Sequence, residues 1–326
     1  MTVNETAVAT EERVDAETAH AWTSLLERLS RQSVTPGKHF DAYADVAWDD
    51  PDYRIDPADP RWELALDEPL AATSWYRAQP AEVRARIGLH MVVTKMKIGL
   101  QFESILKRGL LEFAATLPNR SPEFRYAYHE VIEEAQHSLM FQEFVNRSGI
   151  DVKGMPWRIE LGARRVVHLG RRFPALFFMF VLGGEDPIDY VQREALRNSD
   201  RVHPLLERIM RIHVTEEARH LSFARHYLKN NVPKLARLRR FALAMEAPLI
   251  LGTMSQLMLR PSSDIVKTYS IPRSVVKEAY SKNPAHEAGV RASLRKVRTL
   301  AQDLGLITPL SKPIWKAFGI WEELPA

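Results

Sequence analysis

Two near-copies of one pentapeptide, EEAQH and EEARH, begin at residues 133 and 216 of this 326-residue chain, 83 residues apart. Each copy places a glutamate three positions before a histidine. Because an α-helix turns about 100° per residue, a glutamate and a histidine at this spacing share one helix face. Two such faces opposite each other predict a dinuclear metal site. The two pairs are Glu134 with His137 and Glu217 with His220.

Each half of the chain also has a single carboxylate upstream of its pentapeptide. Glu103 lies 31 residues before Glu134, and Glu185 lies 32 residues before Glu217. This spacing fits a helix that leads away from a site, a turn, and a second helix that returns to the same depth. A dimetal four-helix bundle takes one glutamate from each of two helices and Glu-x-x-His from the other two. Four carboxylates would also balance two divalent cations, which a low-dielectric interior requires.

The two halves differ one turn before the second glutamate of each pentapeptide. His213 stands four residues before Glu217, on the helix face of Glu217 and His220, so we expect a third imidazole ligand there. The alternative is a core histidine satisfied by its packing. The equivalent residue in the first half is Glu130, which we expect to orient a ligand histidine rather than to bind metal.

Glu185 has a competitor in its own segment. Asp189 follows one turn later on the same face and could replace it as a ligand, or contact the ligands from behind. Pro187 lies between them, and its ring should disturb the helical turn near Gly183 and Gly184. We expect this irregularity to direct Glu185 toward the metal ions.

The complete set of residues, with an HxxxExxH string at 213–220, resembles the AurF-type di-iron N-oxygenases, the family of p-aminobenzoate N-oxygenase. The resemblance covers about 80–230. It implies an all-α, ferritin-like four-helix bundle with additional peripheral helices, usually dimeric, in which four glutamates and three histidines bind two iron ions. The matching positions here are Glu103, Glu134, His137, Glu185, His213, Glu217 and His220.

The reaction implied by this resemblance is that of a monooxygenase, which activates O2 and oxidises a small molecule. N-oxygenation of an arylamine, such as an aminobenzoate, is the expected case. The alternatives are a desaturase or hydroxylase of carrier-bound acyl chains and a non-catalytic ferritin-like metal-binding protein. The sequence has no glycine-rich dinucleotide fingerprint, so we expect an external electron donor, a reductase or a ferredoxin. Two iron ions, with manganese as the alternative, are the expected cofactors.

Helical spacing dominates the chain. After an expected disordered tail, 1–16, we predict one helical domain over 17–326 with its core bundle at about 80–230. A Pro- and Asp-rich stretch, 35–70, favours turns. The predicted helices are 17–32, 80–117, 121–148, 174–199, 201–230, 234–259, 273–283, 287–304 and 312–319. Ser121 is the expected N-cap of the second core helix, with Pro122 in its first turn.

Composition limits the remaining possibilities. The chain contains no cysteine, so nitrogen and oxygen ligands remain, and these suit iron or manganese. A net charge of +4, with the basic residues dispersed, gives no reason to expect nucleic-acid binding. The acidic N-terminus lacks a signal-peptide core, and the apolar run 173–184 is too short to span a bilayer. We therefore expect a cytoplasmic protein without an integral membrane segment.

Overall fold

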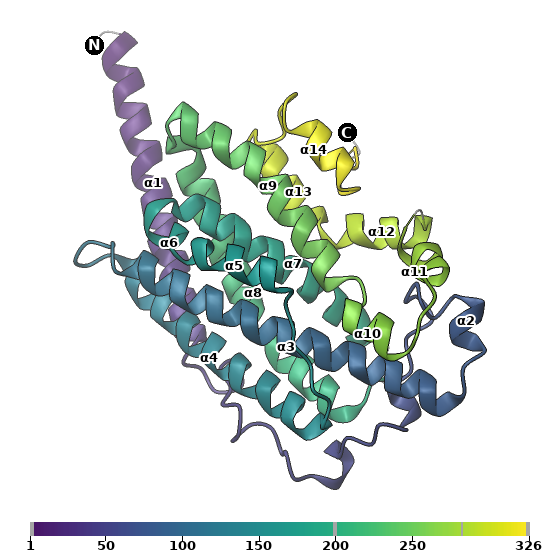
Figure 1. The fold of residues 1–326 in the computed structure, drawn as a ribbon. Coiled ribbons are helices and arrows are strands. Elements are labelled where there is room, and N and C mark those ends of the chain that lie inside the picture. The colour runs from purple at the N-terminus through teal and green to yellow at the C-terminus, as the bar shows by residue number, and fades with distance from the viewer. Residues whose placement is uncertain (1–2, 198–200, 282, 324–326) are drawn as a thin grey trace.

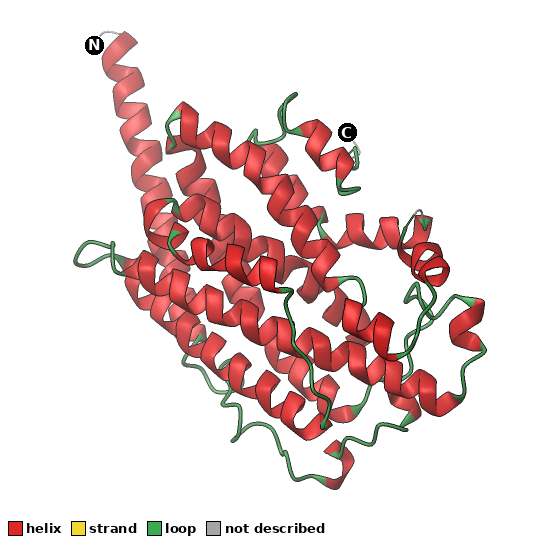
Figure 2. Ribbon diagram, in the orientation of Figure 1, coloured by secondary structure: helices red, strands yellow, loops and turns green. Residues whose placement is uncertain are grey.

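The computed structural model describes residues 3–197, 201–281 and 283–323, and these residues form helices and loops without a β-strand (Figure 2). The predicted all-α, ferritin-like architecture is confirmed. Its centre is a bundle of four long helices: α3 (Ala81–Ala114), α4 (Pro122–Ser148), α7 (Pro174–Arg197) and α8 (Pro204–Asn231). Residues 198 and 199 of the predicted 174–199 helix and residue 282 of the predicted 273–283 helix lie outside the described residues.

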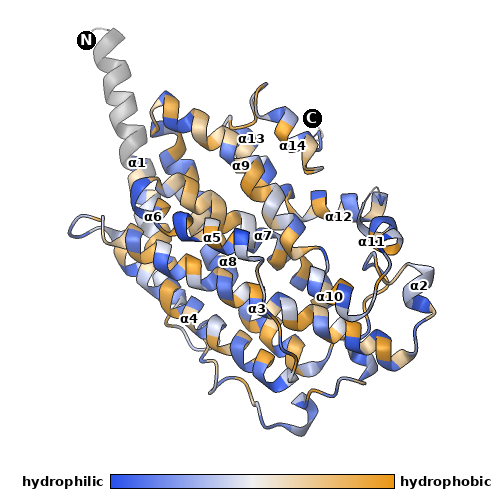
Figure 3. Cartoon of the chain, in the orientation of Figure 1, coloured by the Kyte–Doolittle hydropathy of each residue, from blue (hydrophilic) through white to orange (hydrophobic). Residues whose placement is uncertain are grey.

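The four core helices pack as two hairpins. Helix α3 lies along α4, and α7 lies along α8, so each hairpin contains one single glutamate and one pentapeptide (Figure 1). Apolar and polar residues alternate around these helices, as the orange and blue segments of Figure 3 show. Each helix therefore presents an apolar stripe to its neighbours. The polar site residues lie within this apolar interior.

Local chemistry defines the ends of α4. Ser121 occupies the N-cap position with an extended backbone, and Pro122 follows in the first turn. The Ser121 hydroxyl, however, donates to the Glu123 carboxylate and makes no capping bond to the backbone, so the predicted side-chain cap is absent. Gly149 ends the helix with φ 66°, in the left-handed region that a glycine adopts without strain.

Helix α7 continues through Pro187, which lies in its interior. Proline has no N–H to donate to the preceding turn, so the helix has one hydrogen bond fewer there. The close packing in this region occurs at Gly184. A Cβ atom on Gly184 would overlap the ring of Phe102 on α3. Phe102 precedes Glu103 and Gly184 precedes Glu185, so this contact sets the separation of α3 and α7 at the level of the site.

The remaining helices surround the bundle. Helix α1 (Val3–Gln32) packs against α4 and includes residues of the segment predicted as a tail, so it is longer than the predicted 17–32. Alanine and glutamate in that segment favour helix. The predicted 287–304 helix is divided at Leu294 into two helices, α12 and α13. Four short helices, α2, α5, α6 and α10, were not predicted. The other elements are α2 (Ser74–Arg77), α5 (Trp157–Val167), α6 (Leu169–Arg172), α9 (Arg237–Met258), α10 (Ser263–Thr268), α11 (Arg273–Tyr280), α12 (Pro284–Ser293), α13 (Arg295–Asp303), α14 (Lys312–Ala317) and the 3-10 turns Pro51–Tyr53, Pro60–Trp62 and Val232–Lys234.

One stretch, Arg237–Thr268, has the length and apolar composition of a membrane span. Half of its most apolar window is buried inside the protein. Helix α9 packs against α7 and α14 and contributes Leu243, Ala247 and Leu251 to the hydrophobic core. A core helix of a globular protein accounts for this composition.

The packing at Gly184 gives a first prediction. Gly184→Ala should lower the free energy of unfolding by about 1–3 kcal/mol, because the added methyl group must displace the Phe102 ring. Gly162→Ala on α5 is the matched control, since a Cβ there meets no atom within 4 Å and alanine favours helix over glycine by roughly 1 kcal/mol. Urea denaturation of both variants measures the difference. Equal stabilities would contradict the close contact between α3 and α7.

Candidate metal centre

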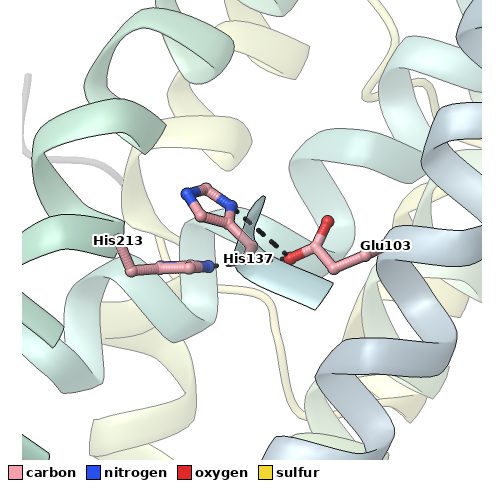
Figure 4. A group of neighbouring side chains, drawn as sticks. All are labelled: Glu103, His137 and His213. Carbon is pink, nitrogen blue, oxygen red and sulfur yellow. Dashed lines mark ion pairs between the residues drawn. The ribbon is translucent and has the colours of Figure 1, made fainter. Parts of the chain in front are cut away.

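The seven residues predicted as ligands come together in the core of the bundle. Their nitrogen and oxygen atoms form overlapping groups of three whose atoms lie within 4.8 Å of one another. All seven side chains are buried. Figure 4 shows one group, in which His137 and His213 both approach the carboxylate of Glu103. The groups that contain these residues are Glu103 with His137 and His213, Glu134 with His137 and Glu217, Glu185 with His213 and Glu217, and Glu134 with His220 and the additional residue Glu130. A fifth group joins His39, Glu133 and Glu216.

The two pentapeptide histidines are held across the pair of helices α4 and α8. His137 Nε2 lies 2.9 Å from Glu216 Oε2, and His220 Nε2 lies 2.7 Å from Glu133 Oε2. Each histidine is thus hydrogen-bonded by the first glutamate of the opposite pentapeptide. The other ring nitrogens, both Nδ1 atoms, face the inner carboxylates. His137 Nδ1 lies 3.0 Å from Glu134 Oε2, and His220 Nδ1 lies 2.9 Å from Glu217 Oε1.

His213 faces the inner carboxylates with Nε2, whereas His137 and His220 face them with Nδ1. Its Nδ1 lies 2.9 Å from Gln192 Oε1, an oxygen that only accepts hydrogen bonds, so Nδ1 carries the proton. The unprotonated Nε2 then faces Glu103 Oε1 at 3.7 Å and Glu217 Oε1 at 3.9 Å. Burial, assisted by the neighbouring His137, holds the pKa of His213 well below its usual range. A neutral imidazole with a free lone pair is the form that binds a metal ion.

The electrostatics of the centre are those of a site that requires cations. Burial raises the pKa of Glu103 well above its usual range, and the nearby Glu134 adds to this effect. Burial raises the pKa of Glu185 in the same way, with Glu217 adding to it. For His137, burial acts to lower the pKa, but the hydrogen bonds to Glu134 and Glu216 outweigh it and raise the pKa to about 10. Without metal, protons therefore neutralise the site.

Unpaired oxygen atoms test whether the residues suit a metal centre. Glu103 Oε2 and Glu217 Oε2 are buried and accept no hydrogen bond within the described structure. A buried carboxylate oxygen without a partner is strongly unfavourable unless a cation or a proton compensates it. Hard oxygen and imidazole nitrogen donors suit iron and manganese. The residues therefore fit a dinuclear centre.

A second polar cluster lies on the outer side of the two pentapeptides, and the sequence analysis did not identify it. Arg219 Nη2 lies 2.7 Å from Glu133 Oε1, and His39 Nδ1 lies 3.5 Å from Glu216 Oε1. The backbone N–H of Phe40 donates to Glu216 at 3.0 Å. The start of the irregular segment 35–70 thus covers the outer face of the site. The sequence signal that could have predicted this cluster is the extra glutamate before each ligand glutamate, Glu133 and Glu216. A ligand histidine commonly donates a hydrogen bond from its second ring nitrogen to a carboxylate.

The structure also separates Glu185 from Asp189. Glu185 belongs to a group with His213 and Glu217, whereas Asp189 belongs to none of the groups found among the described residues. Asp189 Oδ1 accepts a hydrogen bond from Arg193 Nε at 2.7 Å, and Lys296 Nζ lies 3.8 Å from Oδ2. The carboxylate of Asp189 is therefore balanced by cations of the protein, and Glu185 is the better candidate ligand.

Comparison with known proteins agrees with this geometry. The family model described as P-aminobenzoate N-oxygenase AurF matches residues 20–305, nearly the whole chain. The chain belongs to the AurF family.

Its relatives include uncharacterized proteins of Mycobacterium tuberculosis and Mycobacterium bovis. Each is 39% identical over 295 residues, which cover 90% of this chain and 86% of the relative. No solved structure gives a significant match. AurF proteins are di-iron oxygenases, so membership accounts for a bundle core with buried glutamate and histidine clusters that could bind metal.

The bond between Glu216 and His137 gives a second prediction. Glu216→Gln should weaken metal binding about 10- to 100-fold, because a neutral amide holds His137 less strongly and has one oxygen where Glu216 has two. Those two oxygens accept separately from Phe40 and His137. Equilibrium dialysis against Fe²⁺ under anaerobic conditions measures the effect. Glu207→Gln, which removes only an exposed ion pair to Arg211 on the same helix, should bind metal normally. Equal affinities for all three proteins would rule out this role.

A third prediction follows from the pKa shifts. In the metal-free protein the pKa of His137 is raised to about 10 and those of Glu103 and Glu185 are raised well above their usual range. His137 therefore holds a proton at neutral pH, and burial favours the neutral acids of Glu103 and Glu185, so metal binding should release protons and become tighter as the pH rises. Calorimetric titration with Mn²⁺ in two buffers of different ionisation enthalpy measures the release. Identical heats in the two buffers would contradict it.

Proposed function

We propose that this protein is a non-haem di-iron oxygenase that uses O2 to oxidise a small molecule, with N-oxygenation of an arylamine such as an aminobenzoate as its reaction. The observation that carries the proposal is the third imidazole. His213 adds its Nε2 to a site already formed by two Glu-x-x-His pairs and two single glutamates. Membership of the AurF family supports the oxygenase class.

The residues of the chain have separate parts in this proposal. Glu103, Glu134, His137, Glu185, His213, Glu217 and His220 would hold the two ions. When bound, two iron ions supply the electrons that reduce O2 and the Lewis acidity that holds it. Glu133 and Glu216 keep the pentapeptide histidines in one orientation, and Gln192 does the same for His213.

Apolar side chains keep water away from the centre. The ring of Phe141 packs 5.4 Å from that of His213 and 6.2 Å from that of His137, measured between ring centroids. Phe102, which precedes Glu103 on α3, packs on Phe180 with a centroid distance of 5.0 Å. An apolar wall strengthens the electrostatic interactions of the site and protects reactive species from water.

The proposal includes an external electron donor, a reductase or a ferredoxin, because no dinucleotide fingerprint occurs in the sequence. A homodimeric assembly and a cytoplasmic location complete it. The dimer follows from the family resemblance, and the location stays the expectation drawn from the sequence.

The test of the proposed function is turnover. The purified protein, loaded with Fe²⁺, should convert p-aminobenzoate to hydroxylamine and nitro products when O2 and a chemical reductant are supplied. Anaerobic and metal-free samples should be inactive. Oxygen consumption without an oxidised arylamine would contradict the substrate class and lead to carrier-bound acyl chains as the next substrates. A protein that binds neither iron nor manganese would overturn the oxygenase assignment itself.

His213 gives the fourth prediction. His213→Ala should lower the rate of arylamine oxidation at least about tenfold, because one of the two metal ions loses a nitrogen ligand and the site gains a space that water can fill. His226→Ala is the matched control, since His226 is exposed on the same helix and donates only to the Ser222 carbonyl. Metal content and initial rates measured on both variants separate a binding defect from a catalytic one. Full activity in His213→Ala would contradict a ligand role.

A further inference from the structure

Glu130 is a buried carboxylate with no partner. It lies on α4 one turn before Glu134, has no solvent exposure, and neither of its oxygen atoms accepts a hydrogen bond within the described structure. Five other buried carboxylates at the centre each have at least one hydrogen-bond or ion-pair partner, namely those of Glu103, Glu133, Glu134, Glu216 and Glu217. An ionised carboxylate in such a place is strongly unfavourable without a cation.

The side chain is directed into the centre. A carboxylate oxygen of Glu130 lies within 4.8 Å of the ligand atoms of Glu134 and His220, and these three form one of the compact groups in the core. Glu134 and His220 are both residues that we propose to hold metal. Glu130 therefore reaches the centre itself and not only the residues behind it.

The internal symmetry of the bundle gives Glu130 a counterpart. His213 precedes Glu217 by four residues, as Glu130 precedes Glu134. His213 approaches the histidine of the opposite pentapeptide, with its ring centroid 4.7 Å from that of His137. Glu130 approaches the histidine of the other pentapeptide, His220. Each residue thus crosses the bundle to the ion position of the opposite half.

We propose that Glu130 is an eighth ligand, bound to the metal ion at His220 as His213 is bound to the ion at His137. This inference rests on the proposed dimetal centre. The two ions are then inequivalent, because one gains an imidazole and the other gains a carboxylate. A fifth carboxylate also gives the centre one negative charge more than two divalent ions balance, so the ion at His220 is the one that better tolerates a trivalent state.

The experiment compares Glu130→Gln with Glu130→His and the unchanged protein. Anaerobic equilibrium dialysis with Fe²⁺ alone should give two bound ions in the unchanged protein. Glu130→Gln should lose affinity for one of them by at least about tenfold and keep the other. Glu130→His restores a ligand atom and should recover the second ion. Glu143→Gln, which removes only a surface ion pair to Arg147 on the same helix, should behave as the unchanged protein.

Thermal unfolding separates a ligand from a structural residue. Glu130→Gln removes a buried charge and breaks no hydrogen bond, so the melting temperature of the metal-free protein should not fall. Its rise on adding Fe²⁺ should be smaller than in the unchanged protein. A lower melting temperature without metal, or unchanged binding of both ions, would overturn the proposal. If the unchanged protein itself bound no iron, the proposed function would fail; if it bound two ions and Glu130→Gln did too, only this inference would fail.

Discussion

The burial of carboxylates in an apolar core is the constraint on which the structure depends. Seven glutamates on four helices are almost completely removed from solvent within a few turns of one another. The cationic side chain next to the outer pair is Arg219, and protons on the histidines compensate part of the inner charge. Because burial and neighbouring carboxylates both favour the neutral acids of Glu103 and Glu185, cations binding here stabilise the folded state, and metal binding is coupled to folding.

The two hairpins place nearly the same residues around the centre. The few residues that differ between them make the two halves of the centre chemically unequal. In both halves, the first glutamate of the pentapeptide is hydrogen-bonded to the histidine of the opposite pentapeptide. The pentapeptides differ at one position, where Arg219 turns toward the outer carboxylates while Gln136 accepts from the backbone of Ala42. His213 and Glu130 form the second difference. A symmetric site would treat its two ions alike, whereas these two differences give the two pentapeptides unequal surroundings.

Periodicity and spacing predicted the four core helices and brought the seven candidate ligands together, because both depend on the geometry of single helices. The crossed bonds of Glu133 and Glu216 could not be predicted, since they depend on the rotation of α4 against α8. The burial of Glu130 depends on the same rotation. Arg219 and His39 were missed because the cover contributed by segment 35–70 has no helical period. Whether the seven residues bind iron stays a prediction.

Packing contacts between apolar residues determine where the candidate ligands lie. Glu103 and Glu185 reach the centre from α3 and α7, whose separation is set by the Phe102 ring lying against Gly184. A larger residue at 184 would move both carboxylates apart without changing either of them. Side chains on long packed helices hold their positions better than side chains on loops, and a dimetal site tolerates displacements of only a fraction of an ångström. Gly184, which could not bind a metal ion itself, therefore determines the geometry of the centre as much as its neighbour Glu185 does.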